Sequence, residues 1–361
     1  MPENLKRISM CGGAVLAVAA LVMLRLLTAS GAFAGVRPQP LANCNSTALT
    51  GPVADIEVDR ASGVAYLAVF DGAAAREDPL LNGTILKLDL NRPDAQPVAA
   101  IADAPRSFRP QGLSLWIHAD DPARLFVVSR PLDNHSDELE TVEIFEQQAD
   151  GLFHHLKSVT DPLFVHPDDV AAVGAEQFYL TNDRGAGNFL ARAVEAVVRP
   201  GWSNVLYYDG AHASIAVSDR VFATGITVSA DGLRLYLAEA GARELLIFDR
   251  DTLTGSLYWS SLIEVAGAPG KLDIAEDGAL WAAVQPNTWA LNRSIGSARV
   301  APTVILRFKA PVNGFTKAES VYADDGHGFS GGMAAVAHHG RLFVGSVTEK
   351  RLFSCPVPAR S

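Results

Sequence analysis

The residues of this sequence that most suggest chemistry are two adjacent carboxylates, Asp168 and Asp169. They stand before a β-rich run that ends in Thr-Asn-Asp, within the stretch LFVHPDDVAAVGAEQFYLTND at residues 163–183. Neighbouring carboxylates repel each other unless water or a cation lies between them, and hydrophobic burial alone does not require such a pair. The pair therefore indicates a polar site that other residues must complete.

The elements that would position this site repeat along the chain. Six β-rich runs recur at roughly 45 to 60 residues, the spacing expected of propeller blades. They are SGVAYLAVF, DPARLFVVSRP, AEQFYLTND, ADGLRLYLAEA, EDGALWAAVQP and HGRLFVGSV, and each is followed by a strand with period-two alternation. Helical periodicity is scarce, which argues against a parallel α/β sheet. The pattern predicts an all-β, six-bladed β-propeller over residues 40–359, with N- and C-terminal strands closing one blade.

The composition agrees with a single globular domain. Of the 361 residues, 48% are hydrophobic and only 19% are charged, which suits a large buried core and argues against disorder. The formal net charge is −10 and no Lys/Arg cluster is present, so nucleic acid is not expected as a partner.

The N-terminal segment resembles a targeting signal rather than part of the fold. Lys6 and Arg7 precede an apolar run over residues 8–24, and Ala32-Phe33-Ala34 follows. These are the three parts of a secretory signal, so we expect residues 1–34 to be removed after Ala34. The alternative is an uncleaved anchor that would associate the protein with a membrane. Either way, the rest of the chain is expected to be secreted or periplasmic.

The cysteine usage fits that export. Cys11 lies in the N-terminal segment, which leaves Cys44 and Cys355 at opposite ends of the mature chain. They are either two unrelated buried thiols or a disulfide that joins the chain ends, and an oxidising compartment favours the disulfide.

Several short motifs follow one another along the chain. They are Cys44-Asn45, Asp55-Ile-Glu, FRPQGLS at 108–114, DDVAAVGAEQFYLTND at 168–183, FATGITVSADGLRLYLAE at 222–239, LW…QPN at 280–287 and GRLFVGSV…LFSC ending at Cys355. With these motifs the chain resembles the paraoxonase/arylesterase family of calcium-dependent hydrolases, within the gluconolactonase-like six-bladed propellers. The resemblance implies an exported enzyme that hydrolyses lactones or aryl esters.

The same resemblance implies a structural calcium ion in the central tunnel. The matching ligands are Asp55, Asp169 and the backbone carbonyl of Leu113. Ca²⁺ takes several oxygen ligands, and carboxylates from separate blades can converge on a propeller axis. The alternative is that both carboxylates are ordinary turn or strand-end residues.

The family's second, catalytic ion is matched less well. The corresponding positions are Ala54, Asp168, Thr224, Leu272 and Asp273, and two of these offer no side-chain oxygen. We expect either a cation held by Asp168, Asp273, Thr224 and water, or an upper tunnel without metal.

The family's proton-transfer histidines are also replaced. The matching positions hold Gln111, Arg130 and Gln285, none of which can act as a base at neutral pH. Asp168 or Asp273 is therefore the expected catalytic base, and His166 is the nearest histidine in the sequence. The alternative function is a non-catalytic propeller that keeps its structural calcium and binds a small molecule or protein. Metal-independent chemistry in the tunnel is a third hypothesis.

Two adjacent histidine pairs remain, His154-His155 and His338-His339. Neighbours on a strand point to opposite faces, so neither pair is expected to hold a metal ion.

Overall fold

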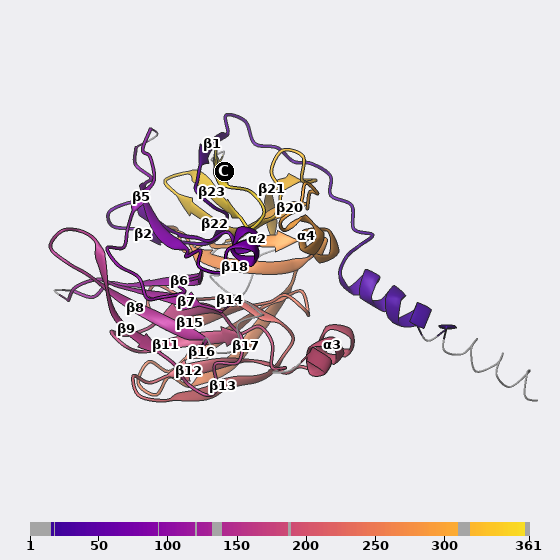
Figure 1. The fold of residues 1–361 in the computed structure, drawn as a ribbon, viewed down its shortest axis with the longest axis horizontal. Helices are drawn as coiled ribbons and strands as arrows, with labels where there is room; N and C mark the ends of the chain where they lie inside the picture. Colours follow the sequence, from indigo (N-terminus) through magenta and orange to yellow (C-terminus); the bar gives the residue numbers. More distant parts are fainter. Residues whose placement is uncertain are drawn as a thin grey trace, which may run out of the picture.

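The computed structural model describes residues 16–17, 19–92, 94–119, 121–131, 139–186, 189–309 and 318–357. Lys6, Arg7 and Cys11 of the expected signal lie outside the described residues. Residues 19–29 form a helix that projects from the main body, at the right in Figure 1. In the described part of the chain, no helix combines the length and the apolar character needed to cross a membrane.

The described strands form six four-stranded antiparallel sheets, which confirms the predicted six-bladed propeller. In chain order, the first five sheets are β2 (Val53–Asp59), β3 (Val64–Val69), β4 (Thr84–Asp89) and β5 (Val98–Ala99); β6 (Pro110–Trp116), β7 (Arg124–Ser129), β8 (Thr141–Gln147) and β9 (Phe153–Val159); β10 (Pro167–Ala172), β11 (Phe178–Asn182), β12 (Ser203–Tyr208) and β13 (Ala213–Arg220); β14 (Ala223–Val228), β15 (Arg234–Glu239), β16 (Glu244–Arg250) and β17 (Leu257–Glu264); and β18 (Ala268–Ile274), β19 (Leu280–Gln285), β20 (Thr303–Phe308) and β21 (Glu319–Asp324). The sixth contains β22 (Gly332–His338), β23 (Arg341–Ser346), β24 (Arg351–Pro356) and β1 (Asn45–Ala48). The first strand of each sheet contacts the first strands of its neighbours, and β2 contacts β22, so the sheets close into a ring.

Residue type follows the position of each strand in its blade. The second strands β7, β15 and β19 are buried on both faces, and they are almost continuously apolar. The outer strand β17 has no buried residue and mixes apolar with polar side chains. Aromatic side chains such as Phe126 and Phe178 fill the space between adjacent blades. The hydrophobic core therefore lies between the blades, and polar residues line the tunnel along the axis.

The closing blade joins the two ends of the chain. Strand β1 pairs antiparallel with β24. A disulfide between Cys44 and Cys355, 311 positions apart in the sequence, locks this pairing. The disulfide prediction is confirmed, and the alternative of two unrelated thiols is excluded.

Each first strand contains a register irregularity near its start, where a bulge can turn a side chain toward the axis. The residues in these irregularities are Ala54, Gln111 and Gly112, Asp168, Thr224 and Gly225, Gly270 and Lys271, and Met333. The backbone is closely packed here, because a Cβ atom at Gly112 would lie 2.3 Å from Oδ1 of Asp169. The bulges therefore bring residues from different blades into contact around the axis.

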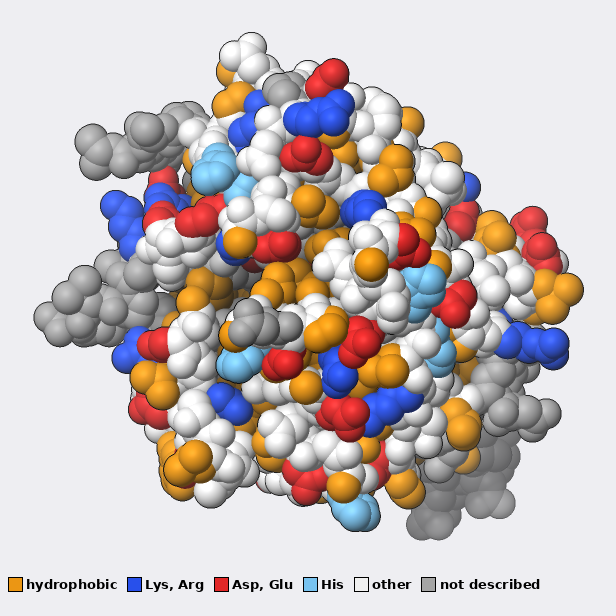
Figure 2. All heavy atoms as spheres, turned by 90° about the vertical axis from the view of Figure 1, so that its left-hand side faces the viewer, with side chains coloured by type: hydrophobic (Ala, Val, Ile, Leu, Met, Phe, Trp, Pro, Cys, Tyr) orange, Lys and Arg blue, Asp and Glu red, His pale blue; other side chains and the backbone are white. Residues whose placement is uncertain are grey.

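Three short helices lie outside the strands: α2 (Gly72–Glu77), α3 (Phe189–Val198) and α4 (Thr288–Ser294). Helices α3 and α4 lie at the same end of the propeller as the N-terminal helix (Figure 1). The opposite face, turned toward the viewer in Figure 2, carries interspersed acidic, basic and histidine side chains around a central hollow.

Candidate active site

The carboxylates predicted for the structural ion do converge on the axis. Oδ2 of Asp55 accepts a hydrogen bond from the backbone N–H of Leu113 at 2.8 Å, and Oδ2 of Asp169 accepts one from Ile226 at 2.9 Å. Both carboxylates, together with Glu57, line one tunnel cavity of about 230 Å³. Each carboxylate is thus anchored by the backbone of the following blade, which fixes its direction toward the tunnel.

The electrostatics of this cavity suit a bound cation. Burial raises the pKa of Asp55 to about 7, although Lys271 opposes the shift, and burial raises the pKa of Glu57 to about 8. Burial also raises the pKa of Asp169 well above its usual range. The buried carboxylates of Asp55 and Asp169 and the partly exposed carboxylate of Glu57 therefore have too little positive charge nearby to keep their usual pKa. Hard oxygen donors in excess are the donor set that Ca²⁺ prefers, so these residues fit a calcium ion.

The part of the tunnel around Asp168, called the upper tunnel here, contains a positively charged side chain, that of Lys271. Nζ of Lys271 lies 2.7 Å from the backbone oxygen of Asp168, 3.2 Å from its Oδ2 and 3.3 Å from Oδ1 of Asp169. Burial would lower the pKa of this ammonium, but the carboxylates of Asp168, Asp169 and Asp55 outweigh burial and raise it. The three contacts can use all three N–H donors of the ammonium.

Lys271 was not identified from the sequence because of the bulge in β18. Matching by sequence placed Leu272 and Asp273 beside Asp168, but the register of β18 shifts between Pro269 and Leu272. The residues displaced by that shift are Gly270 and Lys271, so the side chain that meets Asp168 is an ammonium group and not a carboxylate.

The other residues predicted for the second ion are engaged elsewhere. Asp273 forms an ion pair with Arg60 and accepts a hydrogen bond from the backbone of Ala337. The hydroxyl of Thr224 donates to backbone oxygens, at 2.9 Å from that of Pro269. Asp168, Thr224 and Asp273 are therefore each held by different partners.

A histidine–carboxylate pair lies beside this upper site. Nδ1 of His166 hydrogen-bonds to Oδ1 of Asp183. Nη1 of Arg130 lies 3.0 Å from the same Nδ1, 3.7 Å from Oδ2 of Asp183 and 3.5 Å from Oδ1 of Asp168. Burial would raise the pKa of Asp183, but His166, Arg130 and Arg184 together lower it. Asp183 is therefore ionised at neutral pH and can orient the imidazole.

Hairpin pairing explains how this pair is positioned. Strands β10 and β11 pair Pro167 with Asn182, so the residues flanking them, His166 and Asp183, face each other. Oδ1 of Asn182 also accepts hydrogen bonds from the backbone of Val165 and His166, both at 3.1 Å. Asp183 was not among the catalytic residues predicted from the sequence, but aligning the two strands of the hairpin would have revealed the pair.

Asp183 lines a second, larger cavity at the end of the tunnel, called the mouth cavity here. This cavity has a volume of about 480 Å³, and its wall includes Thr224, Phe222 and Trp289. Leu26, Ala29 and Ser30 of the N-terminal segment complete the wall. The backbone oxygen of Ser30 accepts a hydrogen bond from the backbone N–H of Thr288 at 2.9 Å. Aromatic surface beside a polar cluster suits a small ligand that is partly apolar.

The remaining substituted positions have structural contacts. Oε1 of Gln111 lies 3.5 Å from Nη2 of Arg130, and Nε2 of Gln285 donates to the backbone of Gly332. Ala54, which replaces an acidic ligand of the family, packs against an apolar cluster. These residues maintain the tunnel wall and offer no base.

The arylesterase family model matches residues 71–356. The serum paraoxonase/arylesterase 1 of Rattus norvegicus is 30% identical, and the match covers 90% of this chain and 92% of that protein. The corresponding protein of Homo sapiens is 29% identical over 88% and 90% of the two chains. Among solved structures, a luciferin-regenerating enzyme matches with a TM-score of 0.51 at 14% identity, over 88% of this chain and all of that one, which supports the fold alone.

Proposed function

The chain belongs to the arylesterase family, and we propose that it is an exported hydrolase of lactones or aryl esters. The observation that carries this proposal is the hydrogen bond between His166 and Asp183, because Asp183 lines the mouth cavity. It supplies a base at a site where the family's own histidine positions hold glutamine and arginine.

In this proposal, His166 takes a proton from the attacking water. The tautomer that donates Nδ1–H to Asp183 leaves Nε2 as the acceptor, and Asp183 stabilises the imidazolium that forms. The water oxygen bonds to the substrate carbonyl carbon, and the C–O bond to the leaving group then breaks. The departing alkoxide or phenoxide recovers the proton, so a lactone gives a hydroxy acid. Arg130, beside His166, provides positive charge as the oxyanion develops.

The carboxylates first expected to act as base are less suitable. Asp168 contacts both Lys271 and Arg130, and Asp273 pairs with Arg60. Both carboxylates are thus engaged by cationic side chains. We therefore assign Asp168 to holding Lys271 and Arg130 in place.

We further propose that one calcium ion binds in the lower tunnel cavity. Asp55, Asp169 and the carbonyl of Leu113 would hold it, with Glu57 close by. When bound, the ion would neutralise the buried carboxylates and tie separate blades together. At the second position Lys271 supplies the positive charge, so no step of hydrolysis is assigned to a metal ion there.

The N-terminal segment leads us to propose a secreted or periplasmic location. Either cleavage after Ala34 or retention as a membrane-associated anchor agrees with its sequence.

A second candidate function is a propeller that binds a small molecule without hydrolysing it. It is favoured by one observation, the replacement of all three family histidine positions by Gln111, Arg130 and Gln285.

Turnover of an aryl acetate and of a small lactone by the purified, calcium-loaded protein separates the two functions. We expect turnover by the wild type and a loss of about a hundred- to ten-thousand-fold in kcat for His166→Gln and Asp183→Asn. His154→Gln is the matched control, because that imidazole is partly exposed and contacts Asp150. Hydrolysis that survives His166→Gln would remove the base assignment, and a folded wild type without turnover would favour the binding function.

A further inference from the structure

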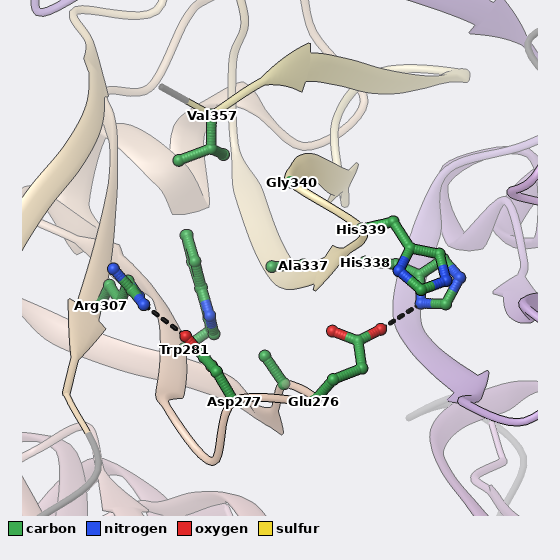
Figure 3. Close-up of a pocket in the computed structure, with 10 residues that line it drawn as sticks. Glu276, Asp277, Trp281, Arg307, Ala337, His338, His339, Gly340 and Val357 are labelled. Atoms are coloured by element: carbon green, nitrogen blue, oxygen red, sulfur yellow. Dashed lines mark hydrogen bonds and ion pairs between the residues drawn. The ribbon is translucent and has the colours of Figure 1, made fainter. Parts of the chain in front are cut away.

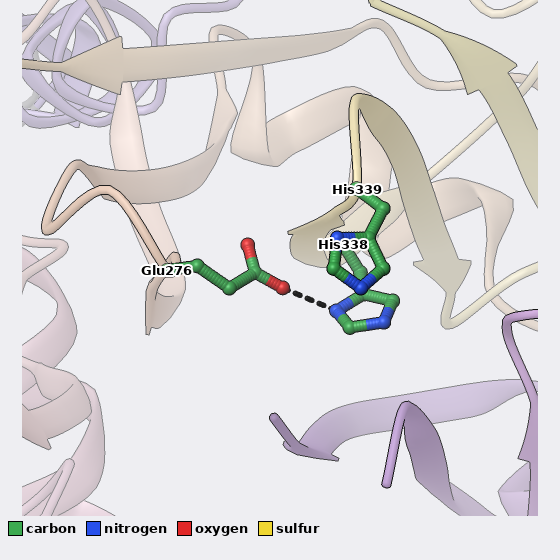
Figure 4. A group of neighbouring side chains, drawn as sticks. All are labelled: Glu276, His338 and His339. Atoms are coloured by element: carbon green, nitrogen blue, oxygen red, sulfur yellow. Dashed lines mark hydrogen bonds and ion pairs between the residues drawn. The ribbon is translucent and has the colours of Figure 1, made fainter. Parts of the chain in front are cut away.

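Two adjacent imidazoles meet a carboxylate on the face away from the mouth cavity. Strand β22 ends at His338, and Glu276 lies in the turn between β18 and β19. His339 has a left-handed backbone, with a φ of 45°, so it does not continue the alternation of the strand. The two rings consequently lie on the same side, with centroids 4.0 Å apart (Figure 4).

The donor atoms of these three side chains converge. One ligand atom from each of Glu276, His338 and His339 lies within 4.8 Å of the other two. Nδ1 of His338 hydrogen-bonds directly to Oε1 of Glu276, and the ring of His339 lies next to this contact (Figure 4). His338 is only 2% exposed, and among the described residues its Nε2 has no hydrogen-bond partner.

The surrounding charges leave Glu276 available to a cation. Nη1 of Arg60 lies 3.5 Å from Oε1 of Glu276, whereas its Nη2 is paired with Asp273. Asp273 therefore balances the guanidinium, and the negative charge of Glu276 is not consumed by it.

A cavity adjoins the three side chains and gives an ion access to them. It has a volume of about 310 Å³, and its other walls include Trp281, Arg307 and Val357 (Figure 3). Arg307 is paired with Asp277 on the far side of this cavity, away from Glu276 (Figure 3). A metal ion at the three side chains would thus have an entry path and space for water.

We propose that Glu276, His338 and His339 bind a divalent transition metal ion of the Zn²⁺ class. Two imidazole nitrogens and one carboxylate oxygen form a donor set that Zn²⁺ accepts while keeping a fourth position open for water. Ca²⁺ prefers oxygen donors, so this site differs in ligand class from the tunnel cavity. The ion would bind between Nδ1 of His338 and Oε1 of Glu276, and the single proton of the neutral ring would then be on Nε2. Bound there, it links the fifth blade to the closing blade.

Titration of the purified protein with Zn²⁺ at saturating Ca²⁺ tests the proposal. We expect one Zn²⁺ per chain in calorimetry, and Co²⁺ should give visible ligand-field absorption when it occupies the same site. His339→Ala and Glu276→Gln should each weaken Zn²⁺ binding by at least about tenfold, the lower bound found for residues that merely support a metal ligand. Both substituted residues are exposed, so folding should survive.

His327→Ala is the matched control, because His327 is exposed and its ring pairs with Asp325. Its Zn²⁺ affinity should equal that of the wild type. Absence of Zn²⁺ binding in the wild type, or an unchanged affinity in His339→Ala, would overturn the proposal. Because binding is read without substrate, a negative result here leaves the hydrolase assignment untouched.

Discussion

Replacement of Lys271 by methionine tests the idea that the protein carries its own cation in the upper tunnel. Methionine keeps most of the side-chain volume and removes the charge. Asp168 and Asp169 would then lose the ammonium that lies 3.2 and 3.3 Å from their carboxylates. Removing one partner of a buried ion pair costs about 3–5 kcal/mol, because the remaining charge stays buried without compensation. We expect a loss of this size in the free energy of unfolding.

Urea unfolding followed by tryptophan fluorescence measures the effect, with and without Ca²⁺. The matched control is Lys157→Met, since Lys157 pairs at 2.6 Å with Glu176 where both side chains are partly exposed. Such a pair contributes about 1 kcal/mol or less. Calcium stoichiometry is the second readout, and we expect one tunnel ion in the wild type. Equal stabilities of Lys271→Met and Lys157→Met, or two tunnel ions in the wild type, would refute the reasoning.

Two further predictions concern the closing disulfide and the tunnel carboxylates. Replacing Cys44 and Cys355 by serine should reduce the free energy of unfolding by about 5 kcal/mol on the chain-entropy model, since the cystine spans 311 positions; denaturant unfolding of oxidised wild type and double variant measures it, and a difference below about 1 kcal/mol would contradict it. Without metal, the raised pKa values of Asp55, about 7, and Glu57, about 8, should stabilise the fold at low pH, and this contribution should disappear as the pH rises through these values. Melting temperatures across pH, with chelator or with Ca²⁺, should show this slope in metal-free wild type and a shallower one in Asp55→Asn; the same slope in both proteins would exclude Asp55 as its source.

The fold could be predicted because it depends on regular patterns, since period-two alternation and the repeating turns defined six blades. Asp55 and Asp169, which line one cavity, were singled out by the family resemblance and not by the pattern of strands. Lys271 could not be predicted, because the bulge in β18 absorbs residues and shifts the side chain that reaches the tunnel. The proximity of the His338 and His339 rings could not be predicted either. The positive φ of His339 breaks the strand alternation that would have placed the two rings on opposite faces.

The N-terminal segment forms part of the wall of the mouth cavity, so its removal would change access to that cavity. The oxygen of Ala29 accepts hydrogen bonds from Arg243 at 3.0 Å and Arg199 at 3.3 Å, and Ser30 is held by Thr288. Cleavage after Ala34 would remove these acceptors and one side of the entrance, leaving Arg199 bonded to the backbone oxygen of Gly241 and the guanidinium of Arg243 without Ala29. The chain with the segment and the chain without it would then differ at the entrance of the mouth cavity. Removal of the segment would favour substrates that carry negative charge.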